Sequence, residues 1–396
     1  MKKIFYVLLF LSIAYPLWAT TYYVCDDATD CNAGDGSGWS TGNNGNNGTA
    51  KSTPWLTLDY AEDTISSGDT VIVGDGTYAA WTITAGWVSE TTFISENKWG
   101  ASINNIVFSG DGAADYITIQ NFELTPSGST AGGISFGSTT GIDHTDVSII
   151  GNKIHGYTCS SFGAIWVGMG TNVLIDGNEI YDCGPTGNEN NDHGIYLSWD
   201  TDNITVQNNI IYGIPDGYPI HAYHDDQNDF TIVNNTLYSE NTYGYPQCIV
   251  LWGTISNMVV RNNLCYDPVG SSYGVRLEGT HTGTLVMTNN VTNAATLCTG
   301  TECGDYTTSD NITSADLSDE FTNAAGKIFT LQSDAVAIGA GIATDAPSED
   351  FIGTARPQNT TYDVGAYEYL FVPPYLNHIG PGSGTISAGS GSMAGQ

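Results

Sequence analysis

A short pattern of apolar and polar positions repeats along the middle of the chain. Seven segments combine an aliphatic strand with an asparagine near its end, and these asparagines lie 26 to 31 residues apart. They are Asn121, Asn152, Asn178, Asn209, Asn235, Asn263 and Asn290. A second kind of strand recurs between them, as in GISF from Gly133 and GIYL from Gly194. Self-similarity at a period of this size indicates a solenoid.

Each repeat holds two short strands of period two, separated by turn residues, and neither strand can bury a face alone. If each repeat is one rung of a coil, equivalent strands pair in parallel about 4.8 Å apart. The aligned asparagines then bond one another along the coil axis. The aligned aliphatic residues fill the interior: Ile134, Ile165, Ile195, Ile220, Ile249 and Val275. A leucine-rich repeat is disfavoured, because no helical leg is present.

The charge balance excludes two classes of partner. The chain has 42 acidic and 9 basic side chains, which gives a formal net charge of -33. So few cations cannot form the basic surface that nucleic acid or an anionic membrane requires. Hydrophobic residues still make up 40% of the chain, so a packed core is expected and disorder is not.

The first residues read as a secretory signal, which we assign to 1–19. Lys2 and Lys3 precede an apolar run, and Ala19 supplies a small residue for cleavage. No later apolar stretch reaches the roughly 18 residues of a membrane-spanning helix. We therefore expect a secreted, extracellular or cell-surface protein with no membrane-spanning segment.

Eight cysteines fit an oxidising destination. The spacing suggests the pairs Cys25 with Cys31, Cys298 with Cys303, Cys159 with Cys183, and Cys248 with Cys265. Many other connectivities are open at this stage. A zinc site is disfavoured because the sequence contains no CxxC pair.

Both ends of the repeat region resemble a known family. The segment TPWLTLDYAEDTISSGDTVIVGDGTY near the start, and ARPQNTTYDVGAYEY from Ala355 near the end, resemble bacterial secreted right-handed parallel β-helix repeat proteins. These have a pectate-lyase-like architecture, and the second segment is similar to that of members with a variable sorting anchor. The resemblance implies an all-β fold, a single-stranded right-handed parallel β-helix (solenoid) with a short N-terminal capping helix.

The predicted organisation has four parts. After the signal peptide come an N-terminal cap over 20–70, the β-helix with its closing segment over 71–370, and a Gly/Ser-rich tail over 371–396. We expect a monomer. Function does not follow from such a fold, because many chemistries share it.

In a strand of the Gly-Ile-x-Φ type, the second and fourth residues point inward and the others point outward. The first outward row is Ser135, Trp166, Tyr196, His221, Val250 and Arg276. A second row continues through Ser198, Tyr223, Trp252 and Glu278. An exposed aromatic stripe of this kind stacks on sugar rings, so Trp166, Tyr196 and Trp252 are candidate substrate-binding residues. The alternative is that a loop or the terminal segment covers the stripe.

Acidic residues follow the same rungs. Aligning Ile195 with Ile220 places Asp200 over Asp225, with Asp226 beside it. Stacked carboxylates repel unless they share a proton or hold a cation, and Ca²⁺ prefers such oxygen ligands. We predict calcium as a cofactor there, against the alternative of carboxylates splayed into solvent at a turn.

Four residues on these rungs are candidates for catalysis. His193, His221 and Tyr223 are of the types that could remove the C5 proton of a uronate and protonate the leaving oxygen. Arg276 is the cation on this face that a pectate-lyase-type mechanism would use as base. The alternative is that the histidines only bond backbone carbonyls. Polygalacturonase signatures are absent from the sequence.

These observations predict a secreted parallel β-helix protein that binds a polysaccharide and acts on it as a lyase or epimerase. The alternative is a noncatalytic cell-surface or adhesive β-helix protein. Because a charge of -33 repels a polyuronate, binding of an anionic glycan is expected to depend on calcium, whereas a neutral glycan meets no such barrier.

Overall fold

The computed structural model of the chain describes residues 19–33, 38–109, 114–128, 132–136, 143–160, 162–184, 191–241, 246–268, 270, 273–316 and 320–370. Only the backbone is described for Asp225 and Asp226. The predicted signal peptide, apart from its last residue, and the predicted tail therefore lie outside the described residues.

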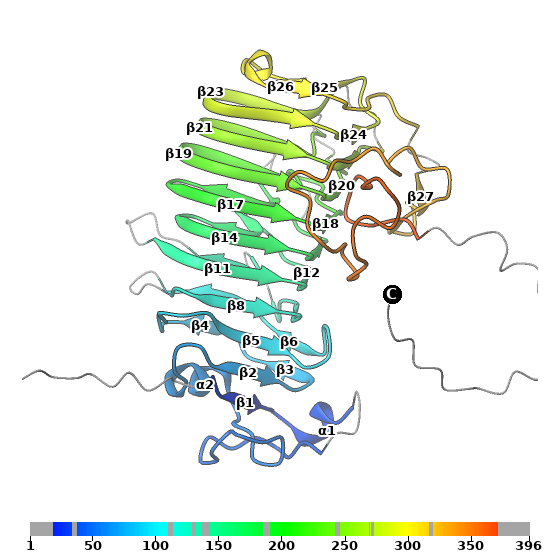
Figure 1. Cartoon of the computed structure of the whole chain (residues 1–396). Helices are drawn as coiled ribbons and strands as arrows, with labels where there is room; N and C mark the ends of the chain where they lie inside the picture. The colour runs from blue at the N-terminus through cyan, green and yellow to red at the C-terminus, as the bar shows by residue number, and fades with distance from the viewer. Residues whose placement is uncertain are drawn as a thin grey trace, which may run out of the picture.

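The chain winds into a parallel β-solenoid of about 8 turns (Figure 1). Its main sheet contains β1 (Thr21–Val24), β2 (Thr70–Val73), β4 (Trp81–Ile83), β5 (Thr91–Ser95), β7 (Ile106–Phe108), β8 (Ile117–Gln120), β10 (Ile134–Phe136), β11 (His144–Ile150), β13 (Gly163–Val167), β14 (Gly170–Asp176), β16 (His193–Ser198), β17 (Thr201–Gln207), β19 (Ile220–Val233), β21 (Ile249–Arg261), β23 (Tyr273–Thr288), β25 (Thr296–Thr299) and β26 (Thr307–Ser309). The predicted fold class is confirmed.

A second parallel sheet closes each turn of the coil. It contains β3 (Gly76–Tyr78), β6 (Ala101–Ile103), β9 (Glu123–Leu124), β12 (Lys153–His155), β15 (Glu179–Tyr181), β18 (Ile210–Ile211), β20 (Thr236–Tyr238), β22 (Leu264–Tyr266) and β24 (Val291–Thr292). Helices are short: α1 (Ala28–Cys31), α2 (Leu58–Thr64) and the 3-10 turn η1 (Cys303–Asp305).

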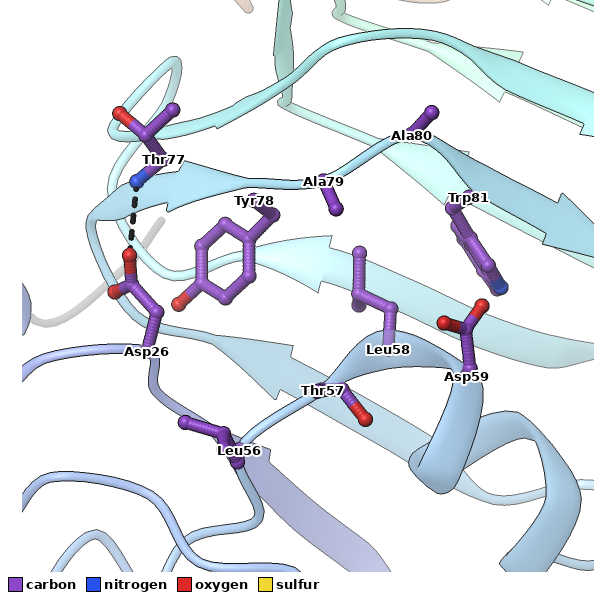
Figure 2. A pocket seen from close by; sticks show the side chains of 10 residues that line it. All are labelled: Asp26, Leu56, Thr57, Leu58, Asp59, Thr77, Tyr78, Ala79, Ala80 and Trp81. Carbon is purple, nitrogen blue, oxygen red and sulfur yellow. Dashed lines mark hydrogen bonds between the residues drawn. The ribbon is translucent and has the colours of Figure 1, made fainter.

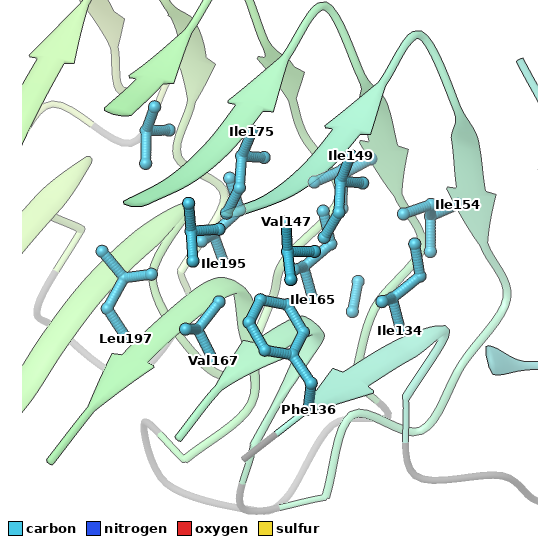
Figure 3. Packing of buried hydrophobic residues seen from close by; sticks show 14 of the residues in the cluster. Ile134, Phe136, Val147, Ile149, Ile154, Ile165, Val167, Ile175, Ile195 and Leu197 are labelled. Atoms are coloured by element: carbon cyan, nitrogen blue, oxygen red, sulfur yellow. The ribbon is translucent and has the colours of Figure 1, made fainter. Parts of the chain in front are cut away.

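The interior row follows the predicted alignment. Ile134, Ile165, Ile195, Ile220, Ile249 and Val275 are paired from rung to rung, and all of them are buried. Figure 3 shows part of this stack, with Ile165 and Ile195 beside the aliphatic residues of the neighbouring strands. Burial of each such side chain contributes about 1.5–3 kcal/mol, and the repeats share one continuous core.

The asparagine ladder is confirmed from Asn152 onward. Asn209 is typical: its backbone N–H and its Nδ2 both donate to Oδ1 of Asn235, at 3.0 Å each. The same bonds connect Asn152, Asn178, Asn209, Asn235, Asn263 and Asn290, and the sequence alignment missed a further member, Asn311.

The assignment of Asn121 to this ladder is wrong. The pairing of Gln120 with Ile150 places Phe122 at the ladder position, and its backbone N–H donates to Oδ1 of Asn152 at 2.9 Å. Asn121 instead lies one residue earlier, at a backbone φ of 64°. Asparagine tolerates this left-handed conformation, so its residue type gave no warning of the shift.

A second series of Asx and Gly residues bends the long strands. Asp146, Asn172, Asn203, Asp229, Asn257 and Gly283 all have positive φ. They lie directly before the aliphatic segment of each rung, where the chain turns from one face of the coil to the next. In β19, β21 and β23 the strand continues through this bend, so one strand carries side chains of both faces.

The N-terminal end carries the predicted helix. Thr57 caps α2, because its side chain accepts a hydrogen bond from the backbone N–H of Tyr60. Leu58 and Ala61 are buried against the first rungs, while Leu56 is 39% exposed. Before this helix, β1 already pairs in parallel with β2 and belongs to the main sheet.

All four predicted disulfides are present. They join Cys25 with Cys31, Cys159 with Cys183, Cys248 with Cys265, and Cys298 with Cys303. No helix in the described part of the chain is long and apolar enough to cross a membrane.

The closing segment packs beside the second sheet. Its hairpin, β27 (Phe321–Asn323) with β28 (Ile328–Leu331), lies beside β18 and β20 in Figure 1. The hairpin and residues up to Tyr369 form a second apolar cluster with side chains of β18, β20 and β22. Arg356 and Glu368 form a fully buried ion pair at 2.9 Å. Removing one partner of such a pair typically costs about 3–5 kcal/mol of stability.

The ladder generates a stability prediction. Asn209→Ala removes bonds to Ile175, Gln207 and Asn235 and leaves the buried backbone groups of the ladder unpaired. We expect a loss of about 2–4 kcal/mol in the free energy of unfolding, measured by urea denaturation. Asn203→Gly, on the same rung but exposed and at a positive φ, is the control and should change stability by less than about 0.5 kcal/mol. Equal effects of the two substitutions would contradict the structural role of the ladder.

Candidate functional site

The two outward rows predicted from the sequence have the predicted register. Ser135, Trp166, Tyr196, His221, Val250 and Arg276 follow one another from rung to rung. Ser198, Tyr223, Trp252 and Glu278 form the second row. The turns between rungs therefore do not disturb the alignment on this face.

The exposure of the first row was predicted wrongly. Tyr196 and His221 are only 6% and 8% exposed, and Val250 is 1% exposed. Neighbouring rings cover them: Tyr218 packs against His221, and His193 packs against Tyr196. Burial raises the pKa of the Tyr196 hydroxyl, which keeps it protonated. Tyr196 thus belongs to the layer beneath the surface and not to the surface itself.

The aromatic surface is formed by other rings. We call it the aromatic ridge and define it as Trp166, Trp199, His224, Tyr223 and Trp252. Ring centroids of Trp199 and His224 are 4.3 Å apart and nearly parallel, and those of Tyr223 and Trp252 are 5.8 Å apart. Tyr223 and Trp252 are 38% and 41% exposed, values that are unusual for such large rings.

Neither Trp199 nor His224 was predicted to lie on this surface. Both follow strand segments whose alternation defines inward and outward positions, but both have positive φ, 47° at Trp199 and 88° at His224. The backbone turns there, so alternation no longer tells which way a side chain points. An aromatic residue at the same place after two successive strands is the one signal that could have identified them.

Arg276 marks one end of the ridge. Its guanidinium carbon lies 5.0 Å from the ring centroid of Trp252, and its Nε is 3.3 Å from Oε1 of Glu278. This arginine therefore contacts both the ridge and Glu278. A guanidinium above an aromatic face holds that ring in one orientation.

His193 and His221 form a buried pair beneath the ridge. Their ring nitrogens, Nε2 of His193 and Nδ1 of His221, are 2.9 Å apart. Burial lowers the pKa of His193 well below its usual value and lowers that of His221 to about 3, with smaller electrostatic effects of His224 and Arg276 adding to the shift at His221. Both rings are therefore neutral near pH 7.

The hydrogen bonds determine where the protons of this pair lie. The backbone N–H of Tyr218 donates to Nδ1 of His193 at 3.2 Å. Because a peptide N–H can only donate, neutral His193 carries its proton on Nε2 and donates it to His221. Neutral His221 then carries its proton on Nε2, an atom without a hydrogen-bond partner in the described part of the chain. His221 is thus arranged as a hydrogen-bond donor, and the reverse tautomer that a base requires is disfavoured.

The predicted metal ligands are only partly described. Asp200 is exposed and lies directly after Trp199, whereas the side chains of Asp225 and Asp226 are outside the described residues. The register brings their backbone segments together, since Ser198 pairs with Tyr223 and Asp202 pairs with Asn228. The paired residues are 25 positions apart in the sequence at Ser198 and Tyr223 but 26 apart at Asp202 and Asn228. The later rung therefore contains one extra residue beside the acidic segment.

One compact group of potential metal ligands occurs elsewhere in the described residues: Cys25, Asp26 and Cys31. The two cysteines form a disulfide, so they offer no thiolate to a metal. Asp26 also lines a small pocket of about 200 Å³ under the N-terminal cap, where it accepts a hydrogen bond from Thr77 (Figure 2). This pocket lies several rungs away from the ridge and contains none of the predicted site residues.

Comparison with solved structures identifies the fold and nothing finer. The chain is similar to pectate lyase Pel9A, with a TM-score of 0.52, 14% sequence identity, and coverage of 88% of this chain and 96% of that one. A rhamnogalacturonan lyase gives a TM-score of 0.42 at 13% identity, covering 74% of this chain and 87% of that one. No family model and no curated protein sequence matches the chain.

The buried histidines generate a pH prediction. His221 is neutral when folded but has a pKa near 6.5 when unfolded, so its contribution to stability is present above pH 6.5 and is lost as the pH falls toward 3. Between pH 8 and pH 5 this loss is about 2 kcal/mol. We expect the free energy of unfolding, measured with urea at both pH values, to fall by about 2 kcal/mol less in His221→Gln than in the parent chain. An unchanged pH dependence in the variant would show that His221 is not held neutral.

Proposed function

We propose that this protein binds a polysaccharide along the aromatic ridge. The observation that supports this most directly is the continuous series of ring contacts across successive rungs, with Tyr223 and Trp252 exposed toward the end that Arg276 marks. Apolar faces of sugar rings stack on such side chains, while sugar hydroxyls remain in water. A purely structural aromatic cluster would be expected to bury these rings.

The ridge runs along the coil axis. From Trp166 to Arg276 it crosses four rung spacings of about 4.8 Å, which gives a length of about 19 Å. A ligand on it is therefore an extended chain of several sugar units and not a single sugar. The four disulfides and the secretory signal read from the sequence support an extracellular place for such a ligand.

Calcium is the cofactor that we propose for an anionic ligand. Asp200, Asp225 and Asp226 would supply carboxylate oxygens from adjacent rungs, at the edge of the ridge where Trp199 and His224 lie. The charge requirement supports this assignment, since Arg276 is already paired with Glu278 and both buried histidines are neutral. A bound cation would offset the repulsion between a polyuronate and a protein of charge -33.

A lyase or epimerase reaction on the bound chain is the second part of the proposal. Arg276 and Tyr223 lie on the ridge, where they would touch the sugar, and we assign proton removal and proton donation to this pair. His193 and His221 lie beneath the ridge, and His221 would position Tyr223, since the two rings are stacked with centroids 5.7 Å apart. The alternative, a noncatalytic surface or adhesive protein, retains the ridge and the glycan but lacks the reaction.

Binding is tested by removing the exposed rings. Trp252→Ala and Tyr223→Ala should each weaken retention of the preferred glycan at least ten-fold in affinity electrophoresis against a polysaccharide panel, because each ring supplies about 1.4 kcal/mol or more of stacking. Tyr362→Ala, in the closing segment, is the matched control and should bind normally. Unchanged retention in both ridge variants would refute the ridge as the binding surface.

Catalysis is tested with the mature chain, with and without calcium, by following the ultraviolet absorbance of unsaturated products and C5 inversion by NMR. We expect product only with calcium, a loss of activity in Asp200→Asn, and a fall in kcat of about 100-fold or more in Arg276→Ala. Arg261→Ala, whose side chain pairs with Asp345 away from the ridge, is the control. If no glycan that binds is chemically altered, the protein is noncatalytic and the proposed reaction is wrong.

A further inference from the structure

A second cavity lies where the coil meets the closing segment. It has a volume of about 420 Å³, within the range of small-molecule sites. The coil contributes Lys98, Gln120, Asp176, Gln207 and Asn208, and the closing segment contributes residues 347–353. None of its lining residues belongs to the aromatic ridge.

Lys98 is the distinctive group of this cavity. Of the nine Lys and Arg residues, seven lie in the described part of the chain, and six of these form an ion pair with a carboxylate. Lys98 is the remaining one: its ammonium has no carboxylate within ion-pair distance and no hydrogen-bond partner among the described residues, and only the more distant charge of Glu179 acts on it. In a protein with 42 acidic side chains, an unpaired cation inside a cavity points to an anionic ligand.

Two aromatic rings hold this ammonium in place. Nζ of Lys98 lies 4.8 Å from the ring centroid of Trp99 and 4.7 Å from that of Phe351. Burial lowers the pKa of Lys98, and nearby Glu179 partly offsets this effect. Gly151 leaves room for the side chain of Asn121, because a Cβ there would lie 2.6 Å from its Oδ1, and Cε of Lys98 passes at contact distance beside the same position. The two rings thus hold the charge of Lys98 in one position, where it is only partly exposed to water.

The other wall is preformed by the closing segment. Asp350 accepts hydrogen bonds from the backbone N–H groups of Ile352 and Thr354, and the N–H of Phe351 donates to the carbonyl of Ala366. Asn208 connects this loop to the coil, since its Nδ2 donates to the carbonyl of Glu349 at 3.0 Å. These bonds fix the position of Phe351 over Lys98 before any ligand arrives.

The remaining lining is rich in groups that bind hydroxyls. Asp176 accepts hydrogen bonds from Gln207 and Asn208, and Gln120 and Asn121 present further amides. Carboxylates such as Asp176 and Glu349 would repel a compact anion but would accept hydrogen bonds from sugar hydroxyls. The lining therefore suits a ligand that combines one carboxylate with several hydroxyl groups.

We infer that this cavity binds an acidic sugar unit of the hexuronate type, with its carboxylate on Lys98 and its hydroxyls on the amides and on Asp176. This site is separate from the ridge and does not depend on the proposed reaction there. It would give the protein a second contact with an acidic glycan, at the junction of the coil and the closing segment.

The test is isothermal titration calorimetry of the full mature chain with D-galacturonate, with D-galactose as the neutral analogue and with acetate as the bare carboxylate. We expect galacturonate to bind at least ten-fold more tightly than galactose, and no binding of acetate. Lys98→Gln should weaken galacturonate binding at least ten-fold. Lys51→Gln, which removes a cation already paired with Glu96, should leave it unchanged.

Further variants separate this site from the ridge and from a folding defect. Trp252→Ala should bind galacturonate normally, whereas Lys98→Arg, which keeps the charge, should retain measurable binding that Lys98→Gln loses. Unfolding midpoints of the variants must match that of the parent chain. The proposal would be overturned if galacturonate gave no heat of binding, or if galactose or acetate bound as tightly as galacturonate. Unchanged galacturonate binding by Lys98→Gln would also overturn it. Each of these results would count even if the ridge binds polysaccharide as expected.

Discussion

The register between successive rungs is the constraint on which the rest of this molecule depends. Backbone hydrogen bonds set the spacing between parallel strands, but they do not by themselves select which residues face each other. The ladder from Asn152 to Asn311 makes that selection, because each side chain up to Asn290 bonds both the next asparagine and a backbone carbonyl of the previous rung. A slip of one residue would break every such bond at once.

A fixed register converts a one-dimensional repeat into continuous rows of side chains. Inside the coil the rows form an aliphatic core, and outside they form the aromatic ridge. The ridge requires both the register and the backbone bends at Trp199 and His224, which bring two rings from adjacent rungs into contact. Beneath it, the hydrogen-bonded pair of His193 and His221 stays uncharged, so the face combines aromatic surface with little positive charge.

Much of this could be predicted from the sequence because the repeat is regular where it faces the core. The Ile row, the ladder from Asn152, the four disulfides and the order of the outward rows were all predicted and found. Prediction failed where a backbone turn interrupts the alternation, as at Asn121, Trp199 and His224. It also overestimated the exposure of Tyr196 and His221, because burial of an outward residue depends on rings from other turns that no local pattern reveals.

The closing segment stabilises the coil by covering its second sheet, and it also forms one wall of the cavity at Lys98. Glycan binding on the ridge can be seen directly in a crystal structure of the mature chain with a bound oligosaccharide of its preferred glycan. We expect sugar rings stacked on Tyr223 and Trp252, with the sugar chain running along the coil axis. Sugar bound elsewhere, with these two rings left in solvent, would contradict this expectation.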